Sequence, residues 1–214
     1  MITFYGRKSS DNVQKTLWML LETGQPHEHI ELGGKFGGLE DPDFRKLNPH
    51  GRVPVLVDGE TVVWESSAII RYLAAAYCSG SLWPEDVRER AGVDKWMDWA
   101  QTRLYPDSNR LFWRVIRTPE ADQDAEKIAA DNHTLNGHLA LADAQLEGRN
   151  YLCGEALTMA DIIAGAPLYR YFEMPIERPA LSNVARWYET LSQRPAYQQA
   201  VMVPFDDLRG RLAF

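Results

Sequence analysis

Serine and cysteine side chains are the first residues in this chain to test for chemistry. Ser9 and Ser10 directly precede apolar residues at helical spacing, Val13–Leu21, so a hydroxyl stands at a helix N-terminus, where it can cap the helix. A serine-hydrolase nucleophile would sit in a G-x-S-x-G turn, and the chain has none. Cys78 and Cys153 are far apart and form no C-x-x-C, which argues against a dithiol redox centre, a zinc finger or a disulfide framework.

Histidines come in two pairs. His27 and His29 share one face of an expected strand, whereas His133 and His138 are five residues apart and share no helix face well. Two histidines without a third ligand do not make a metal site. We therefore expect no metal and no bound cofactor.

Two further patterns stand apart from ordinary structure. Pro54 lies at the entrance of a buried strand, where proline removes a ladder donor, so it is tolerated only at a first residue or an edge. Tyr105, Asn109 and Trp113 lie at i, i+4 and i+8 of one expected helix. Such a stripe either packs in a core or lines a pocket.

The overall composition excludes several classes of protein. The chain has 214 residues, enough for one large or two small domains, and 45% of them are hydrophobic. Its 23 basic and 30 acidic side chains leave a net charge of −7, so we expect no nucleic-acid partner. No apolar run is long enough for a membrane span, and no export signal opens the chain. We therefore expect no membrane association and a cytoplasmic location.

The periodicity divides the chain into two differently built halves. Residues 1–77 read as strand, helix, strand, a glycine-rich loop with a short helix, a hairpin and a helix beginning after Ser66 as N-cap. Residues 78–86 read as a linker, and residues 87–214 carry only helical patterns. Within this all-α half, Thr158 and Asp161 have the spacing of a capping box.

Four motifs in this order resemble the cytosolic glutathione transferase family along the whole chain. They are Tyr5–Gly24, Leu47–Gly59, Trp64–Ala74 and Leu157–Ile162. The first is most similar to the serine-type phi class, whose start reads Ser-x-Asn-Val-x-basic, so the chain resembles a bacterial-type member with a phi- or theta-like N-terminal motif. The resemblance implies an α/β thioredoxin-like N-terminal domain followed by an all-α C-terminal domain that carries the pocket for the second substrate. It also implies a homodimer that uses glutathione as co-substrate for detoxification.

The resemblance also implies how the tripeptide is held. The Val53–Pro54 bond would be cis, so that an extended peptide can pair with the backbone of Val53 as an added strand. The γ-glutamyl ammonium would meet Glu65, and the γ-glutamyl carboxylate would meet Ser66 and its helix N-terminus.

The contact to the glycyl carboxylate is where this chain departs from the phi pattern. Lys35 and Arg52 are the cations available for it. A His-Lys pair usual in that class is missing near Leu39 and Glu40, and Arg52 replaces a glutamine.

The thiol of glutathione must ionise to react. With a pKa of about 8.5, only about 3% of it is thiolate at pH 7. Lowering that pKa by about two units requires about 2.7 kcal/mol. A hydrogen bond to a charged acceptor provides about 1.5–3 kcal/mol and a helix N-terminus about 0.3–1 kcal/mol. Ser10 is positioned to provide both.

Other residues and other functions stay open at this point. Ser9, Asn12 and Tyr5 are alternative donors to the thiol, although the Ser-x-Asn-Val spacing favours Ser10. Tyr105, Asn109 and Trp113 are the candidates for the pocket that receives a small hydrophobic electrophile. The alternatives to a conjugating enzyme are a glutathione-dependent peroxidase and a non-catalytic binding protein on the same scaffold.

Overall fold

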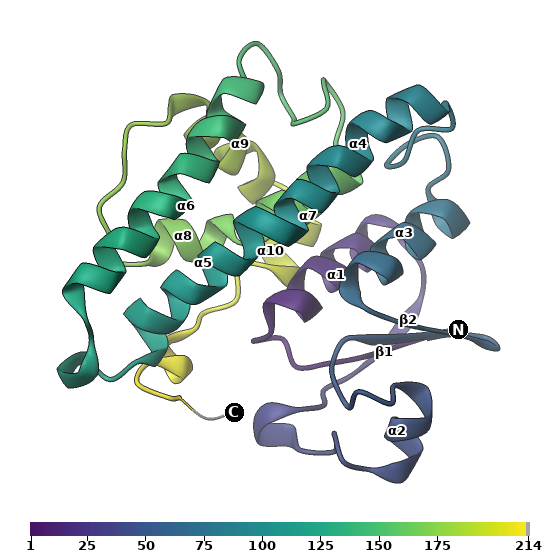
Figure 1. The fold of residues 1–214 in the computed structure, drawn as a ribbon. Coiled ribbons are helices and arrows are strands. Elements are labelled where there is room, and N and C mark those ends of the chain that lie inside the picture. Colours follow the sequence, from purple (N-terminus) through teal and green to yellow (C-terminus); the bar gives the residue numbers. More distant parts are fainter. Residues whose placement is uncertain (213–214) are drawn as a thin grey trace.

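The computed structural model describes residues 1–212 and contains an α/β unit followed by a helical unit (Figure 1). Its four-stranded sheet has the order β2-β1-β3-β4, with β1 and β2 parallel and the other pairs antiparallel. The strands are β1 (Ile2–Tyr5), β2 (His27–Ile30), β3 (Val55–Asp58) and β4 (Thr61–Trp64). Short strands joined by a helical crossover and then a hairpin fit the alternating patterns of residues 1–77.

Three helices and one helical turn complete this unit. They are α1 (Asp11–Glu22), the turn η1 (Gly34–Phe36), α2 (Pro42–Leu47) and α3 (Ser66–Tyr77). Helix α3 differs from the expectation at its start: Glu65 is the N-cap, with φ of 69°, and Ser66 is already helical. The prediction that Ser66 caps this helix was wrong, because its hydroxyl instead donates to Asn12 Oδ1 at 3.0 Å.

The second half is helical, as its periodicity predicted. A continuous helical stretch runs from residue 87 to residue 117 and alternates α segments with π segments. These are α4 (Val87–Trp99), η2 (Ala100–Leu104), α5 (Tyr105–Phe112) and η3 (Trp113–Arg117). The remaining helices are η4 (Glu120–Asp122), α6 (Ala125–Gln145), α7 (Met159–Gly165), α8 (Leu168–Glu173), α9 (Ser182–Ser192), α10 (Pro195–Ala200) and η5 (Asp206–Leu208).

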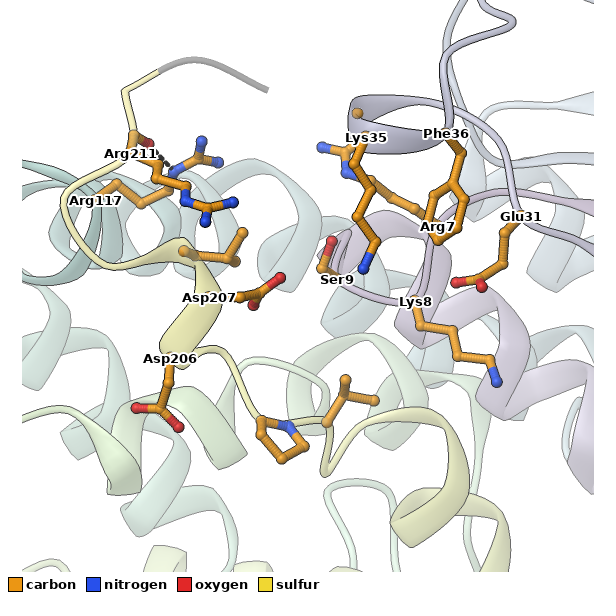
Figure 2. Close-up of a pocket in the computed structure, with 14 residues that line it drawn as sticks. Arg7, Lys8, Ser9, Glu31, Lys35, Phe36, Arg117, Asp206, Asp207 and Arg211 are labelled. Atoms are coloured by element: carbon orange, nitrogen blue, oxygen red, sulfur yellow. Dashed lines mark hydrogen bonds between the residues drawn. The ribbon is translucent and has the colours of Figure 1, made fainter.

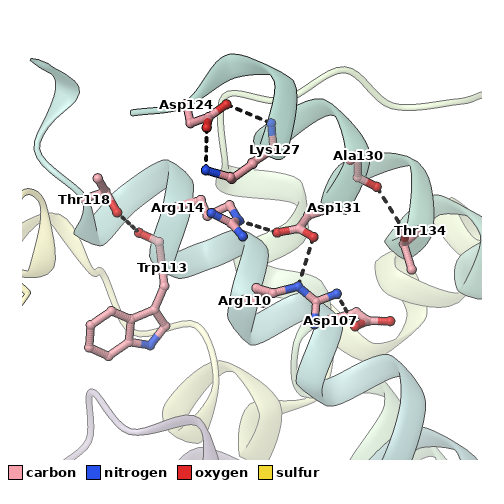
Figure 3. Close-up of polar contacts among 10 residues, drawn as sticks. All are labelled: Asp107, Arg110, Trp113, Arg114, Thr118, Asp124, Lys127, Ala130, Asp131 and Thr134. Atoms are coloured by element: carbon pink, nitrogen blue, oxygen red, sulfur yellow. Dashed lines mark hydrogen bonds and ion pairs between the residues drawn. The ribbon is translucent and has the colours of Figure 1, made fainter. Parts of the chain in front are cut away.

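Ion pairs join α5 and η3 to α6 on the side away from the α/β unit. Arg110 and Arg114 both donate to Asp131 of α6, and Arg110 also pairs with Asp107 (Figure 3). Trp113 points away from this network. The stretch 105–117 therefore packs against α6 through its charged face, and Trp113 lies on a different face.

A single apolar core crosses from one half to the other. Trp18 of α1 packs edge-on against Tyr197 of α10, with ring centroids 4.7 Å apart. Gly165 of α7 lies so close to Trp18 that a methyl group there would come within 3.4 Å of its ring. At the edge of this contact, Arg194 pairs with Glu22 at 2.7 Å. The two halves are thus held in a fixed relation, and a cleft opens where they meet.

The expected capping box is present at α7. Thr158 is the N-cap, and Asp161 is fully buried. The Asp161 carboxylate accepts hydrogen bonds from the backbone N–H of Leu152 and from the backbone N–H and hydroxyl of Thr158, each at 2.9 Å. This pair belongs to the helical core and stands apart from the cleft.

Candidate active site

The cleft between the two halves has a volume of about 690 Å³. Its walls come from the start of α1, the loop before β3, the stretch 105–117 and Arg170 of α8. Its lining includes Ser9, Ser10, Asn12, Arg52, Val53, Tyr105, Asn109 and Trp113. The structure therefore gathers most of the residues singled out in the sequence around one space.

The loop before α1 holds Ser10 in position without using its hydroxyl. Ser10 is the N-cap residue of α1, with φ −93° and ψ 125°, yet its side chain makes no capping bond. The loop is fixed instead by Gln14 Nε2, which donates to the Lys8 carbonyl at 2.9 Å, and by Arg170 Nη2, which donates to the Ser9 carbonyl at 2.8 Å. A serine hydroxyl at a helix N-terminus, not engaged as a cap, is available as a donor to an anion.

The alternative donors differ in their surroundings. Tyr5 is absent from the residues that line the cleft, and its ring packs against Phe44 with centroids 6.0 Å apart. Asn12 lines the cleft, but its Oδ1 accepts the Ser66 hydroxyl. Ser9 lines the cleft as Ser10 does. The geometry therefore leaves Ser9 and Ser10 as the two candidate donors to the thiol, and experiment must distinguish them.

The loop before β3 forms the opposite wall. The Val53–Pro54 peptide bond is cis, and Val53 precedes Val55, whose pairing with Tyr5 is the first in the ladder. Asn48 Nδ2 donates to the Arg52 carbonyl at 2.8 Å, which fixes the backbone just before the bend. Val53 and Arg52 both line the cleft.

Three of the expected glutathione contacts lie outside the lining of this cleft. Lys35 lines an adjoining hollow of about 380 Å³, shown in Figure 2, together with Arg7, Ser9 and Arg117, which border both spaces. Glu65 and Ser66 border neither space, although the Ser66 hydroxyl reaches Asn12 on the cleft wall. Arg52 is therefore the predicted cation that the structure places directly on the cleft.

The wall contributed by the helical unit is aromatic and partly buried. Tyr105, Asn109, Phe112 and Trp113 line it. Burial, with the nearby charge of Asp11, raises the pKa of the Tyr105 hydroxyl well above its ordinary value, so Tyr105 is neutral at physiological pH. This wall provides apolar surface and a neutral donor for a second ligand.

Arginines are the functional feature that the sequence reasoning missed. Arg7, Arg117 and Arg170 line the cleft beside Ser9 and Ser10. They come from the loop after β1, from η3 and from α8, so no local pattern joins them. The signal available was Arg7 with Lys8, two adjacent basic residues that follow the first strand.

Potential metal ligands and cysteine thiols are the other groups in residues 1–212 that could carry chemistry. Among them, no group of three or more His, Cys, Asp or Glu side chains is arranged to hold a metal ion. His29 Nε2 lies 2.7 Å from the Gly6 carbonyl, so this nitrogen carries a proton and donates it to that oxygen. Burial raises the pKa of Cys153 to about 11, and neither cysteine lines the cleft. None of the helices in this part of the chain is long and apolar enough to span a bilayer.

Comparisons with known proteins cover nearly the whole chain. The family model described as "Glutathione S-transferase, N-terminal domain" matches residues 4–80, and the corresponding C-terminal domain matches residues 93–195. Glutathione S-transferase GstB of Escherichia coli strain K12 is 38% identical over 206 residues, covering 95% of this chain and 99% of the relative. Glutathione S-transferase 3 of Zea mays is 30% identical over 208 residues, covering 94% and 93%.

A solved structure is similar in both sequence and shape. The theta class glutathione S-transferase of Xanthomonas axonopodis pv. citri, determined with glutathione bound, is 48% identical and superposes with a TM-score of 0.89. The match covers 95% of this chain and 98% of that one. The four motifs, the sheet topology and these matches agree on one family, and they confirm the thioredoxin-like fold predicted for the first half.

Proposed function

The chain belongs to the glutathione S-transferase family and is a glutathione transferase, and we propose that Ser10 activates the glutathione thiol in the cleft described above. The observation that carries the proposal is the hydroxyl of Ser10, which lies at the N-terminus of the twelve-residue helix α1 and makes no capping bond. The related theta class glutathione S-transferase from Xanthomonas axonopodis pv. citri was solved with glutathione bound, which supports glutathione as the ligand of this chain.

The tripeptide would lie extended against the loop before β3. Its backbone would pair with Val53 as an added strand, and Arg52 on the same wall would meet the glycyl carboxylate. Lys35 in the adjoining hollow is a second cation for that carboxylate. The γ-glutamyl group would approach Glu65 and the N-terminus of α3, beyond the part of the cleft that is lined by Asn12.

The conjugation reaction then requires an anionic sulfur on one wall of the cleft and an electrophile on the opposite wall. Ser10 keeps its proton and donates a hydrogen bond to the thiolate, and the helix N-terminus adds favourable charge. The thiol proton leaves to solvent. The sulfur forms a bond to an electrophilic carbon held against Tyr105 and Trp113, and the leaving group departs with its electron pair.

Two serine variants test this role directly. Ser10→Ala should raise the pKa of the bound thiol by about one to two units, because it removes a hydrogen bond of about 1.5–3 kcal/mol to a charged group. Turnover of a generic aryl halide at pH 7 should fall about tenfold. The pKa is read from the ultraviolet absorbance of the thiolate in the enzyme–glutathione complex.

Ser9→Ala is the matched variant, since Ser9 lines the same cleft one residue earlier. We expect it to leave the thiol pKa near the parent value and turnover within about twofold of the parent protein, because no hydrogen bond to the sulfur is removed. If Ser9→Ala raises the thiol pKa and Ser10→Ala does not, the donor is Ser9. The expected homodimer, the cytoplasmic location and the domain limits at residues 77 and 87 stay predictions.

A further inference from the structure

The peptide group between Ser9 and Ser10 is fixed at both of its polar atoms. The Ser10 N–H donates to the Arg7 carbonyl at 3.1 Å, a bond within the loop itself. The Ser9 carbonyl accepts from Arg170 Nη2 at 2.8 Å. On the other side, the Ser10 carbonyl accepts from the backbone N–H of Gln14 at 2.8 Å. Because peptide groups are planar, these bonds together set the backbone rotation at Ser10 and with it the direction of its side chain.

Arg170 also holds the residue that follows Ser10. Its Nη1 pairs with Oδ1 of Asp11, the first residue of α1. One guanidinium therefore reaches the residues immediately before and after Ser10 with its two terminal nitrogens. The planar fork of arginine suits such a double contact, and the single nitrogen of a lysine cannot reproduce it.

The guanidinium is itself held in place inside the protein. Arg170 is 5% exposed, and its guanidinium carbon lies 4.2 Å from the centroid of the Phe112 ring on the cleft wall. Arg170 belongs to α8 of the helical unit, whereas Ser10 begins α1 of the α/β unit. The contact therefore ties the backbone at Ser10 to a rigid part of the other half of the chain.

Stability alone gives a weak reason for this arrangement. The buried Nε of Arg170 has no hydrogen-bond partner among the residues that the structure describes. A buried N–H without an acceptor is unfavourable, and a buried ion pair is often no more stable than apolar side chains of similar size. The Ser10 side chain, in turn, makes no capping bond that would fix its own backbone. Arg170 thus flanks a residue that needs support from outside its own helix.

We infer that Arg170 is a positioning residue for the reaction: by bonding the Ser9 carbonyl and the Asp11 carboxylate, it holds the Ser10 hydroxyl in line with the glutathione sulfur. The inference rests on the proposed function, because it concerns the same hydroxyl. Arg170 acts through Ser10 and transfers no proton or electron pair in the conjugation. A hydrogen bond weakens steeply when its donor is misplaced, so the thiolate is less stabilised when this support is removed.

The substitution Arg170→Lys tests the inference, because it keeps the positive charge and removes the double contact. We expect it to raise the pKa of the bound glutathione thiol by about one unit, a tenfold change in the ionisation constant. With a parent pKa of about 6.5, the loss of turnover of the aryl halide should be about tenfold at about pH 5.5 and should vanish near about pH 9.5, where both thiols are ionised. The thiol pKa is read from the ultraviolet absorbance of the thiolate.

A double-mutant cycle separates an action through Ser10 from a direct effect on the sulfur. The Ser10→Ala protein has no hydroxyl left to position. Adding Arg170→Lys to it should therefore leave the thiol pKa within about 0.3 units of the Ser10→Ala value.

The matched control is Arg178→Lys. Arg178 donates from Nε to the Tyr171 carbonyl at 3.0 Å and from Nη2 to the Phe172 carbonyl at 2.8 Å, both in α8, and it is absent from the residues that line the cleft. The same substitution therefore disturbs α8 without touching the loop at Ser10, and it should leave the thiol pKa unchanged. Unfolding midpoints show whether each variant is folded.

A second test variant combines Arg170→Met with Asp11→Leu. It removes one charge of each sign from the cleft, so the net charge there is kept, and it removes the hydrogen bond to the Ser9 carbonyl. We expect it to raise the thiol pKa as Arg170→Lys does. Should Arg170→Lys not fold, the same comparisons with this variant decide.

Each result supports or overturns the inference. An unchanged thiol pKa in Arg170→Lys, with Ser10→Ala raising it, would overturn the inference and leave the proposed function intact. An equal rise in the parent and Ser10→Ala backgrounds would overturn it as well, because Arg170 would then act on the sulfur without Ser10. If Arg178→Lys raises the pKa as much as Arg170→Lys, a general loosening of α8 is the cause and the inference is wrong. If Ser10→Ala leaves the pKa unchanged, the proposed role of Ser10 and the inference fail together.

Discussion

Lys15 is a buried lysine that contacts Tyr105 of the cleft wall, and replacing it should make the protein more stable. It lies on α1, has 0% of its surface exposed, and donates from Nζ to Gln101 Oε1 at 2.6 Å. Its Nζ also lies 4.2 Å from the centroid of the Tyr105 ring. Burial lowers its pKa from 10.5 to about 7, although the charges of Asp11 and Glu65 act in the opposite direction. The substitution Lys15→Met nearly keeps the length of the side chain and removes the charge.

The expected magnitude follows from the size of this pKa shift. A shift from 10.5 to about 7, at about 1.36 kcal/mol per unit, corresponds to a cost of about 4–5 kcal/mol when the lysine is charged in both states. Losing the hydrogen bond to Gln101 subtracts about 1 kcal/mol. Gln101 Oε1 keeps the Ser67 hydroxyl as a donor at 3.2 Å, so no acceptor is left unpaired. We therefore expect a net gain of about 3–4 kcal/mol at pH 6.

The gain should disappear as the pH rises. Between about pH 7 and 10.5 the unfolded chain binds a proton at Lys15 that the folded protein does not, so the stability of the parent protein rises with pH through this window. The Lys15→Met variant lacks this titrating group and therefore lacks that rise. The difference between the two proteins should shrink from about 3–4 kcal/mol at pH 6 to near zero at about pH 9.5.

Urea unfolding followed by tryptophan fluorescence, at a series of pH values and a fixed protein concentration, measures this difference. The matched control is Lys95→Met, since Lys95 is an exposed lysine on α4, and we expect it to leave the free energy of unfolding at pH 6 within about 0.5 kcal/mol of the parent value. A Lys15→Met variant that is less stable than the parent protein at pH 6, or a difference that stays constant with pH, would refute the reasoning, because Lys15 would then be a favourably solvated cation.

Two further predictions concern buried carboxylates. Asp161→Ala leaves the buried backbone N–H groups of Leu152 and Thr158 without acceptors, so thermal denaturation should show a loss of about 3–5 kcal/mol, or roughly 10 °C in Tm. Arg170→Met leaves the Asp11 carboxylate, only 10% exposed, without its cation, and should cost about 3–5 kcal/mol in urea unfolding. Adding Asp11→Leu to Arg170→Met should restore much of that loss; no recovery would show that the pair is not the source of it.

Much of the fold follows from the sequence because its signals are local. The helix predicted over Val13–Leu21 extends over Asp11–Glu22, and the capping box at Thr158 and Asp161 begins α7 as expected. Each depends on spacing within one or two turns, where side-chain periodicity and capping act directly. Ser66 shows where this reasoning stops: its preference for the N-cap position is a local tendency, and a hydrogen bond to Asn12, 54 residues earlier, accompanies a different role.

The candidate site contains residues of both kinds, some that a local motif predicts and some that only folding brings together. Ser10 and Val53 were recognisable because each belongs to a short motif, whereas the arginine cluster depends on three chain segments that meet only after folding. The overall charge of −7 even argues against a basic site, since composition averages over a surface that is mostly acidic. Arg170 makes the point most sharply: its hydrogen bond to the Ser9 carbonyl spans 161 residues, yet it fixes the backbone next to Ser10. A buried arginine whose hydrogen-bond partner lies in the other half of the chain has no periodic or local signature, so only the folded chain shows that Arg7, Arg117 and Arg170 line one cleft.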